Sequence, residues 1–163
     1  FQATEGGNSI LKKTETLALD EARNLLFASS EDESRVEVFQ LSTADDLDEH
    51  VGERQLGVIA QDGRFANDVE VLATDTVNQL MIMSDELNGR LLVHDLASPD
   101  LFDGDEGFGF IKAFGRVGGA PGEFLSADGV AISPSQDLVV IADQGNYRIQ
   151  AFRSSDIIAA INP

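Results

Sequence analysis

Residues 128–152, DGVAISPSQDLVVIADQGNYRIQAF, decide the fold. Short apolar or alternating runs are separated there by clusters of turn residues, which is the pattern of short strands in a meander. The expected strands are residues 129–132, 138–142 and 147–152. The stretch therefore predicts a unit of three antiparallel strands joined by two tight turns.

Two earlier stretches can be laid over this unit without a gap: residues 15–39, ETLALDEARNLLFASSEDESRVEVF, and residues 70–94, EVLATDTVNQLMIMSDELNGRLLVH. Equivalent positions keep their character, as in Leu25, Leu80 and Leu138, which open the second strand of each copy. A repeat of this length with about four short strands per unit is typical of a β-propeller blade. The sequence predicts an all-β fold, a β-propeller of which three blades are present.

The connectors between the repeats supply the remaining strands. Residues 55–60 and 110–114 are strand candidates, whereas the acidic connectors at 42–52 and 98–109 are expected to be solvated. Propellers close with about 4 to 8 blades. We therefore expect residues 1–163 to form a single partial propeller of a six-bladed ring. A complementary half, from the rest of the same protein or from a second chain, would complete it.

The charge narrows the possible partners. The chain has 29 acidic and 11 basic residues, a formal net charge of −18, which repels nucleic acids and anionic membranes. This charge fits a solvated acidic surface, carboxylates that hold calcium, or both. No apolar run reaches the roughly 20 residues of a membrane span. The chain has no cysteine, which is compatible with any cellular compartment. We expect a secreted or periplasmic protein.

An acidic residue opens each repeat: Glu15, Glu70 and Asp128. Equivalent positions of propeller blades form a ring around the axis, so these three carboxylates should meet at one end of the channel. Asp68, two residues before Glu70, should point the same way. Such carboxylates repel one another unless they are protonated or bridged by a cation, and calcium accepts 6 to 8 oxygen ligands. The alternative is that each acid caps backbone amides at its own loop–strand junction.

A second column pairs an acid with an arginine across a tight turn, Asp85 with Arg90 and Asp143 with Arg148. We expect these to be structural pairs within a blade, with phosphate binding by the arginines as the alternative. Residues 143–149, DQGNYRI, resemble the NHL repeat, whose blades carry such a pair. Other catalytic motifs are missing from the sequence.

Residues 62–70, DGRFANDVE, look like a stretch of the β-propeller phytases, D-G-R-x-x-x-D-V-E-G. Glu15 with the following residues 17–21, LALDE, is similar to another motif of that family, and residues 127–130, ADGV, resemble a third. Residues 149–158 resemble the end of the last phytase blade. The match spans about 150 residues in order and corresponds to the second half of a six-bladed phytase.

This resemblance implies calcium-dependent hydrolysis of phytate (myo-inositol hexakisphosphate), a phosphoric monoester, or of a related phosphoester. Carried over, Glu15, Asp68, Glu70 and Asp128 would be calcium ligands. The chain departs from the family at Ser29-Ser30, where phytases carry an acidic pair, and it lacks the half that holds most of their basic residues. The alternative is an NHL-like propeller that acts as a binding or scaffold module without catalysis, so enzymatic activity stays open.

Overall fold

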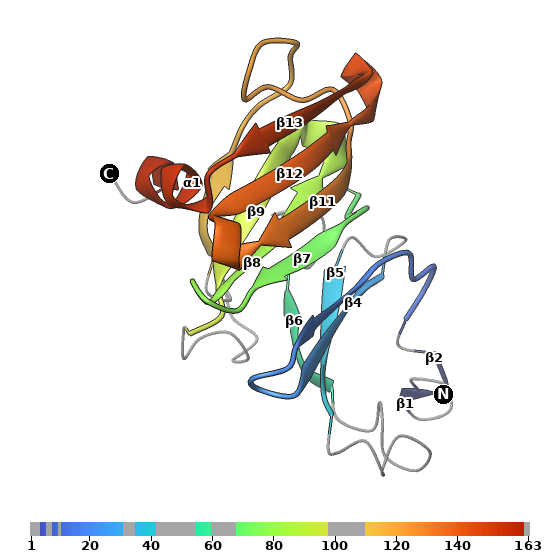
Figure 1. Ribbon diagram of the computed structural model, residues 1–163. Coiled ribbons are helices and arrows are strands. Elements are labelled where there is room, and N and C mark those ends of the chain that lie inside the picture. Colours follow the sequence, from blue (N-terminus) through green and yellow to red (C-terminus); the bar gives the residue numbers. More distant parts are fainter. Residues whose placement is uncertain are drawn as a thin grey trace.

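The computed structural model describes residues 4–5, 8–9, 11–30, 35–41, 55–59, 68–97 and 110–161 (Figure 1). Both acidic connectors lie outside the described residues, and so do residues 62–67 of the phytase-like motif. A short hairpin near the start of the chain joins β1 (Thr4–Glu5) and β2 (Asn8–Ser9).

Three antiparallel sheets follow one another along the chain, and each is a meander of consecutive strands. The first blade contains β3 (Leu17–Asp20), β4 (Leu25–Ser30), β5 (Arg35–Gln40) and β6 (Gln55–Ile59). The second contains β7 (Leu72–Asp75), β8 (Leu80–Asp85), β9 (Arg90–Asp95) and β10 (Phe110–Phe114). The third contains β11 (Ala127–Ser133), β12 (Leu138–Asp143) and β13 (Arg148–Phe152). The strands predicted at 55–60 and 110–114 are therefore confirmed.

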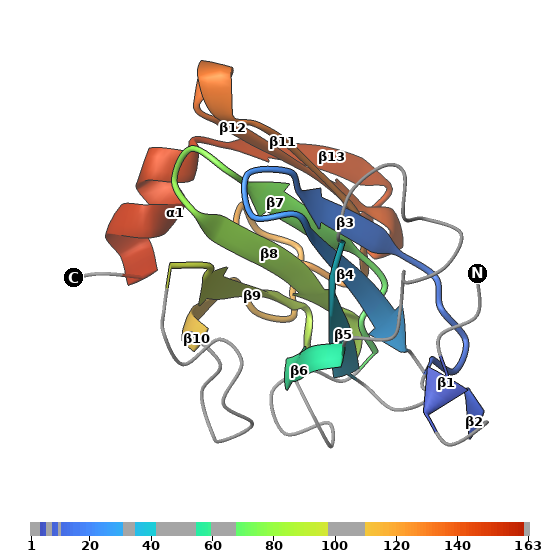
Figure 2. The ribbon, with the colours of Figure 1, turned by 90° about the horizontal axis from the view of Figure 1, so that it is seen from below.

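The blades are stacked around their first strands. β7 contacts β3 on one side and β11 on the other, and the later strands of each sheet extend away from this centre (Figure 2). Two hydrogen bonds tie the first two blades together here: Leu72 N donates to Thr16 Oγ1 (3.3 Å), and Thr74 Oγ1 donates to Leu19 O (2.7 Å). The predicted all-β partial propeller is confirmed.

Two apolar cores lie between the blades. Phe27 and Val38 of the first blade pack against Met81, Met83 and Leu92 of the second. On its other face the second blade buries a second set against the third blade: Leu80, Ile82, Leu91 and Val93 with Phe124, Val139 and Ile141. Each fully buried side chain of this size contributes about 1.5–3 kcal/mol to folding.

The burial pattern of the central strands shows which sheet faces are covered by a neighbouring blade. All six residues of β8 are buried, because the second blade has a neighbour on each side. In β12 burial alternates from residue to residue, because its side chains point to opposite faces and one face lacks such cover. The second blade is thus the interior one, and the third blade has an open face.

Helix α1 (Ser154–Ile161) follows β13 and was not predicted. Its contacts explain it: Ile157 is buried in the second core, and the helix packs on β10. At its start, the Ser155 amide and hydroxyl donate to the Asp137 carboxylate at 2.8 and 2.6 Å. A helix this short depends on such tertiary packing rather than on intrinsic propensity.

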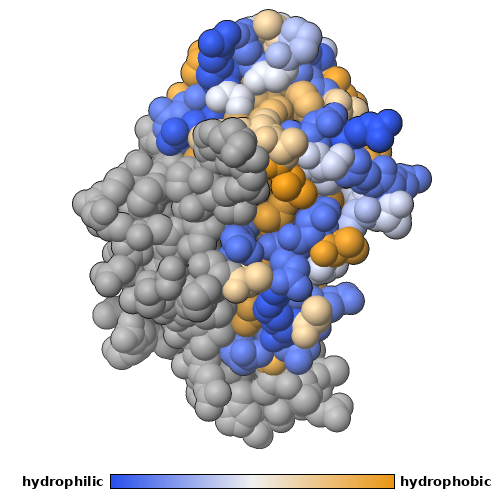
Figure 3. Space-filling model, turned by 90° about the vertical axis from the view of Figure 1, so that its left-hand side faces the viewer, coloured by the Kyte–Doolittle hydropathy of each residue, from blue (hydrophilic) through white to orange (hydrophobic). Residues whose placement is uncertain are grey.

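The described surface in Figure 3 is mostly hydrophilic, with hydrophobic side chains near its middle. This matches the large excess of acidic residues in the chain. Within the described residues, no helix has the length and apolar character needed to cross a bilayer.

Candidate metal centre

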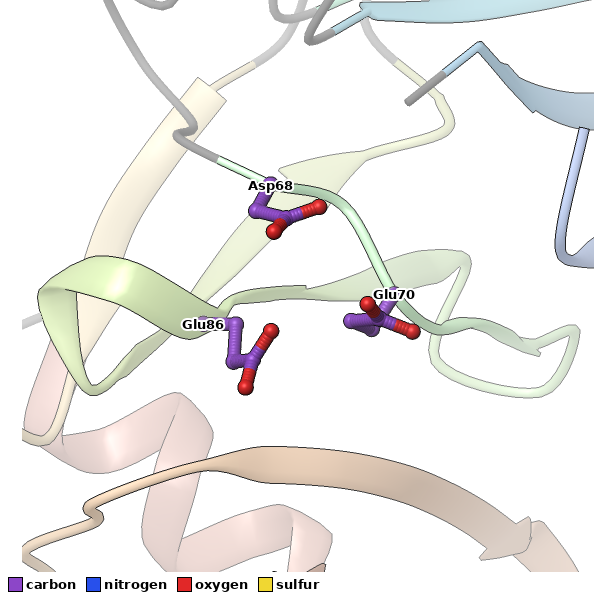
Figure 4. Close-up of side chains that lie close together, drawn as sticks. All are labelled: Asp68, Glu70 and Glu86. Carbon is purple, nitrogen blue, oxygen red and sulfur yellow. The ribbon is translucent and has the colours of Figure 1, made fainter. Parts of the chain in front are cut away.

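Three carboxylates of the second blade gather at one end of its sheet. Asp68 and Glu70 lie just before β7, and Glu86 begins the 3-10 turn η4 (Glu86–Asn88) after β8. One carboxylate oxygen from each residue lies within 4.8 Å of those of the other two. Figure 4 shows the three side chains around one space between these two segments. The backbone holds the segments together, since Glu86 N donates to Asp68 O at 3.2 Å.

The neighbouring blades extend this group on both sides. Glu70 shares a hydrogen bond with Glu15 of the first blade. On the other side, the Ser126 hydroxyl lies 2.6 Å from Glu86 Oε1 and also contacts Asp128 Oδ1 of the third blade. The four residues singled out in the sequence are therefore joined, through Glu86 and Ser126, into one acidic cluster of five carboxyl groups. We use this name below for Glu15, Asp68, Glu70, Glu86 and Asp128.

The cluster has fewer protons than its contacts require. A hydrogen bond between the carboxyl groups of Glu15 and Glu70 requires one proton, and the Ser126 hydroxyl has one proton to share between two carboxylates. The pKa of Glu70 is raised from 4.5 to about 7 by burial, by the hydrogen bond with Glu15, and by the negative charges of its acidic neighbours. A bound cation would relieve this repulsion and replace the proton.

Asp68 supplies a second observation that points to a ligand. Its Oδ1 atom is buried and has no hydrogen-bond partner among the described residues. A buried carboxylate oxygen without a partner is costly, and such atoms in folded proteins commonly face an ion or water. The left-handed backbone of Asp68 (φ 74°) is shared by Lys13 at the equivalent position of the first repeat (φ 52°). The first two repeats therefore share this conformation, whereas Ser126, the equivalent residue of the third repeat, does not have it.

Serine hydroxyls accept hydrogen bonds from backbone amides at the loop–strand junctions of the first two blades. Ser84 Oγ accepts from the amides of Glu70 and Val71 at 3.1 and 2.9 Å. Ser29 Oγ, at the equivalent position, accepts from the amides of Glu15 and Thr16 at 3.3 and 3.1 Å. The geometry therefore disfavours amide capping as the reason for the acids at Glu15 and Glu70.

Ser30 takes over part of the role of the acid found in the other repeats. In the third blade the Asp143 carboxylate accepts from Leu125 N at 3.0 Å. In the first blade Ser30 Oγ accepts from Lys12 N, the equivalent amide, at 2.9 Å. Serine thus keeps the loop in place without adding negative charge beside the cluster.

The two acid–arginine pairs hold their turns. Arg90 Nε donates to Asp85 at 2.6 Å, and Arg148 Nε donates to Asp143 at 2.8 Å. Both carboxylates are fully buried. The terminal nitrogens of Arg148 donate to the carbonyl oxygens of residues 119, 120 and 123 at 2.6–2.8 Å. These contacts use the Arg148 guanidinium within the blade and leave little of it for a phosphate.

Sequence reasoning missed Glu86 and Ser126. A trace of Glu86 is visible in the repeats, because it lies 16 residues after Glu70, as Gln144 lies 16 residues after Asp128. The contact between Glu86 and the third blade depends on how the blades pack, which the repeat alignment does not contain.

Comparison with known proteins supports the architecture. No family model matches the sequence, and no curated protein matches it significantly. Among solved structures, a luciferin-regenerating enzyme matches with a TM-score of 0.61 at 13% identity, over 85% of this chain and 40% of that one. Hydrazine synthase from Kuenenia stuttgartiensis matches with a TM-score of 0.62 at 14% identity, over 96% of this chain and 37% of that one.

A chain of a nidogen/laminin complex matches with a TM-score of 0.58 at 18% identity, over 88% of this chain and 45% of that one. The chain is a partial β-propeller. It spans less than half the length of each of these neighbours. At such low identities the likeness shows the propeller fold and carries no information about the chemistry.

Proposed function

We propose that the acidic cluster binds calcium. The main support is that five carboxyl groups from three blades form one cluster. The cluster has too few protons to give every carboxyl–carboxyl and hydroxyl–carboxyl contact its own hydrogen bond. The donors are all oxygen atoms, which suits a hard cation, and calcium accepts 6 to 8 of them in flexible geometry. The unpartnered oxygen of Asp68 would be one ligand. Glu15, Glu70, Glu86 and Asp128 would supply the others.

We further propose that the propeller is a calcium-dependent phosphoric monoester hydrolase of the β-propeller phytase type, acting on phytate or another inositol phosphate. This rests on the motif resemblance together with the cluster. A chain with a net charge of −18 can accept a polyphosphate where bound cations reverse the local field. Calcium bound to phosphate oxygens and to water would supply the electrophile and the nucleophile.

The remaining parts of the proposal concern context. A complementary propeller half would bring the basic residues that hold substrate phosphates. We propose a secreted or periplasmic location, because a site built of carboxylates suits the higher calcium concentrations outside the cytoplasm. An NHL-like binding module without catalysis is the competing function, and phosphate release decides between the two.

Calcium binding to the purified chain, measured by isothermal titration calorimetry, tests the metal site. We expect saturable binding below about 1 mM. Glu70→Gln and Glu86→Gln should weaken it at least tenfold, because each removes a charged ligand. Glu21→Gln is the matched control, since Glu21 is an exposed acid on the turn after β3, at the other end of the blade. The absence of wild-type binding in the millimolar range would refute the metal site.

Phosphate release from phytate tests catalysis separately. It should require calcium and fall on Glu70→Gln substitution once the ring is complete. Calcium binding without any phosphate release by the completed ring would leave the metal site standing and would assign the protein to the non-catalytic alternative.

A further inference from the structure

The third blade packs against the turn that carries Glu86. Gly89 closes this turn, since its amide donates to Glu86 O at 2.9 Å. The Glu86 side chain lies beside the space that it shares with Asp68 and Glu70 (Figure 4). Residues 115–126, the segment between β10 and β11, contact the same turn from the other blade. The third blade therefore touches the second next to the acidic cluster.

Gly89 has no room for a side chain. A Cβ atom at this position would lie 2.5 Å from Phe124 O and 2.8 Å from Val117 Cα and Cγ2, all in the segment 115–126. The left-handed backbone of Gly89 (φ 57°) does not by itself require glycine, because Tyr147, the equivalent residue of the third repeat, has φ 54°. Glycine is needed at position 89 because the third blade approaches so closely.

The segment 115–126 is anchored in its own blade. The Arg148 guanidinium donates to the carbonyl oxygens of residues 119, 120 and 123 at 2.6–2.8 Å. Phe124 O, the atom that a Cβ of residue 89 would meet first, accepts from Gly118 N at 3.1 Å. A side chain at position 89 would therefore displace the turn of the second blade rather than this segment.

Ser126 joins the end of the segment to the cluster. Its hydroxyl lies 2.6 Å from Glu86 Oε1 and also contacts Asp128 Oδ1. Ser126 is 9% exposed, and its carbonyl oxygen accepts from Gln144 N at 2.8 Å, so its backbone is fixed as well. A hydrogen bond from such a hydroxyl orients the carboxylate that receives it, as the outer partners of metal ligands do.

We propose that Val117, Phe124 and Ser126 form a brace that positions Glu86 for the cation, and that Gly89 admits this brace. The proposal rests on the calcium binding proposed above. Gly89 and Ser126 are positioning residues, because they act on the ion through the Glu86 carboxylate. It follows that the third blade sets the calcium affinity of a group of carboxylates, Asp68, Glu70 and Glu86, that belongs to the second.

The calcium affinity of the 163-residue chain, measured by isothermal titration calorimetry, tests the brace. Gly89→Ala should raise the dissociation constant about tenfold or more, because the added methyl group pushes the turn away and withdraws the Glu86 carboxylate. Ser126→Ala should have an effect of similar size, since it removes the hydrogen bond to Glu86.

Gly122→Ala is the matched control. Gly122 lies in the same segment and also has a left-handed backbone (φ 78°), yet a Cβ atom there would meet no atom within 4 Å. This variant carries the backbone cost of replacing such a glycine without the collision, so its dissociation constant should stay within about twofold of the wild-type value. Thermal unfolding in calcium-free buffer shows which variants are folded at the temperature of the titration. If Gly89→Ala is unfolded there, Ser126→Ala decides alone.

The double variant with Gly89→Ala and Ser126→Ala shows whether Gly89 acts through the Ser126 contact. Both changes would break the same contact, so the double variant should bind calcium at most about twofold more weakly than the weaker single variant. Effects that multiply overturn the brace, and so does wild-type affinity in Ser126→Ala; both results leave calcium binding in place. Failure of the wild-type chain to bind calcium overturns the proposed function and the positioning role together.

Discussion

Glu70→Gln should change how the free energy of unfolding depends on pH. The size of this change follows from the pKa that the acidic cluster gives Glu70. In the folded protein the pKa of Glu70 is about 7, whereas the unfolded chain has an ordinary glutamate near 4.5. Between these values the folded state holds a proton that the unfolded state has lost. The free energy of unfolding of the wild-type protein should therefore fall as pH rises from about 4.5, and the loss should be complete near pH 8.

The difference between the two pKa values sets an upper bound of about 3 kcal/mol on this loss. Glu70 is partly exposed, and solvent screening should reduce the loss to about 1–2 kcal/mol. For a chain of this length that corresponds to about 3–6 °C in Tm. Glutamine cannot ionise, so Glu70→Gln should lack this component while Glu21→Gln keeps it.

Thermal unfolding in calcium-free buffer from pH 5 to 8 measures the effect, with the difference in Tm between wild type and Glu70→Gln as the readout. Calcium supplies a second measurement, since the metal must displace the proton. Binding should release about 0.9 of a proton at pH 6 and about 0.1 at pH 8. Parallel Tm profiles for wild type and Glu70→Gln would refute the reasoning about the cluster.

Two substitutions test the supporting structure by urea unfolding. Asp143→Ala should destabilise the protein by about 3 kcal/mol or more, because it leaves the Arg148 guanidinium and the Leu125 amide without their buried partner. A loss below about 1 kcal/mol would contradict a structural role for this pair. Asp156→Ala is the control, because Asp156 is exposed. Ser84→Ala should cost about 1–3 kcal/mol, because two amides lose their acceptor, and an unchanged midpoint would mean that water replaces the hydroxyl.

The fold was predictable because each repeat carries its own strands and turns. The leucines that open the second strand, Leu25, Leu80 and Leu138, all lie at the start of that strand in the structure. The alternation of strand and turn residues is local, so it can be read along the chain. Helix α1 escaped prediction because its stability comes from β10 and the second core, which the tail sequence does not reveal.

The candidate site was predictable in part. Glu15, Glu70 and Asp128 were found as a column, since equivalent residues of propeller blades meet around the axis. Glu86 and Ser126 were not found, because their contact joins the end of β8 to the start of the third blade. Contacts between blades depend on packing geometry, and a gapless alignment of repeats compares positions only within a blade.

The shared pattern of covered faces also has an evolutionary consequence. Each blade has one apolar side that faces the blade before it and an opposite apolar side that faces the blade after it. Leu91 lies on the second of these sides in the second blade, and Ile149 is its equivalent in the third. Duplicating or deleting one unit of 55 to 58 residues therefore inserts or removes a whole interface without redesigning either neighbour. Gene rearrangement can therefore change the number of blades in one step. Selection can then vary the size of the ring separately from the residues of the acidic cluster.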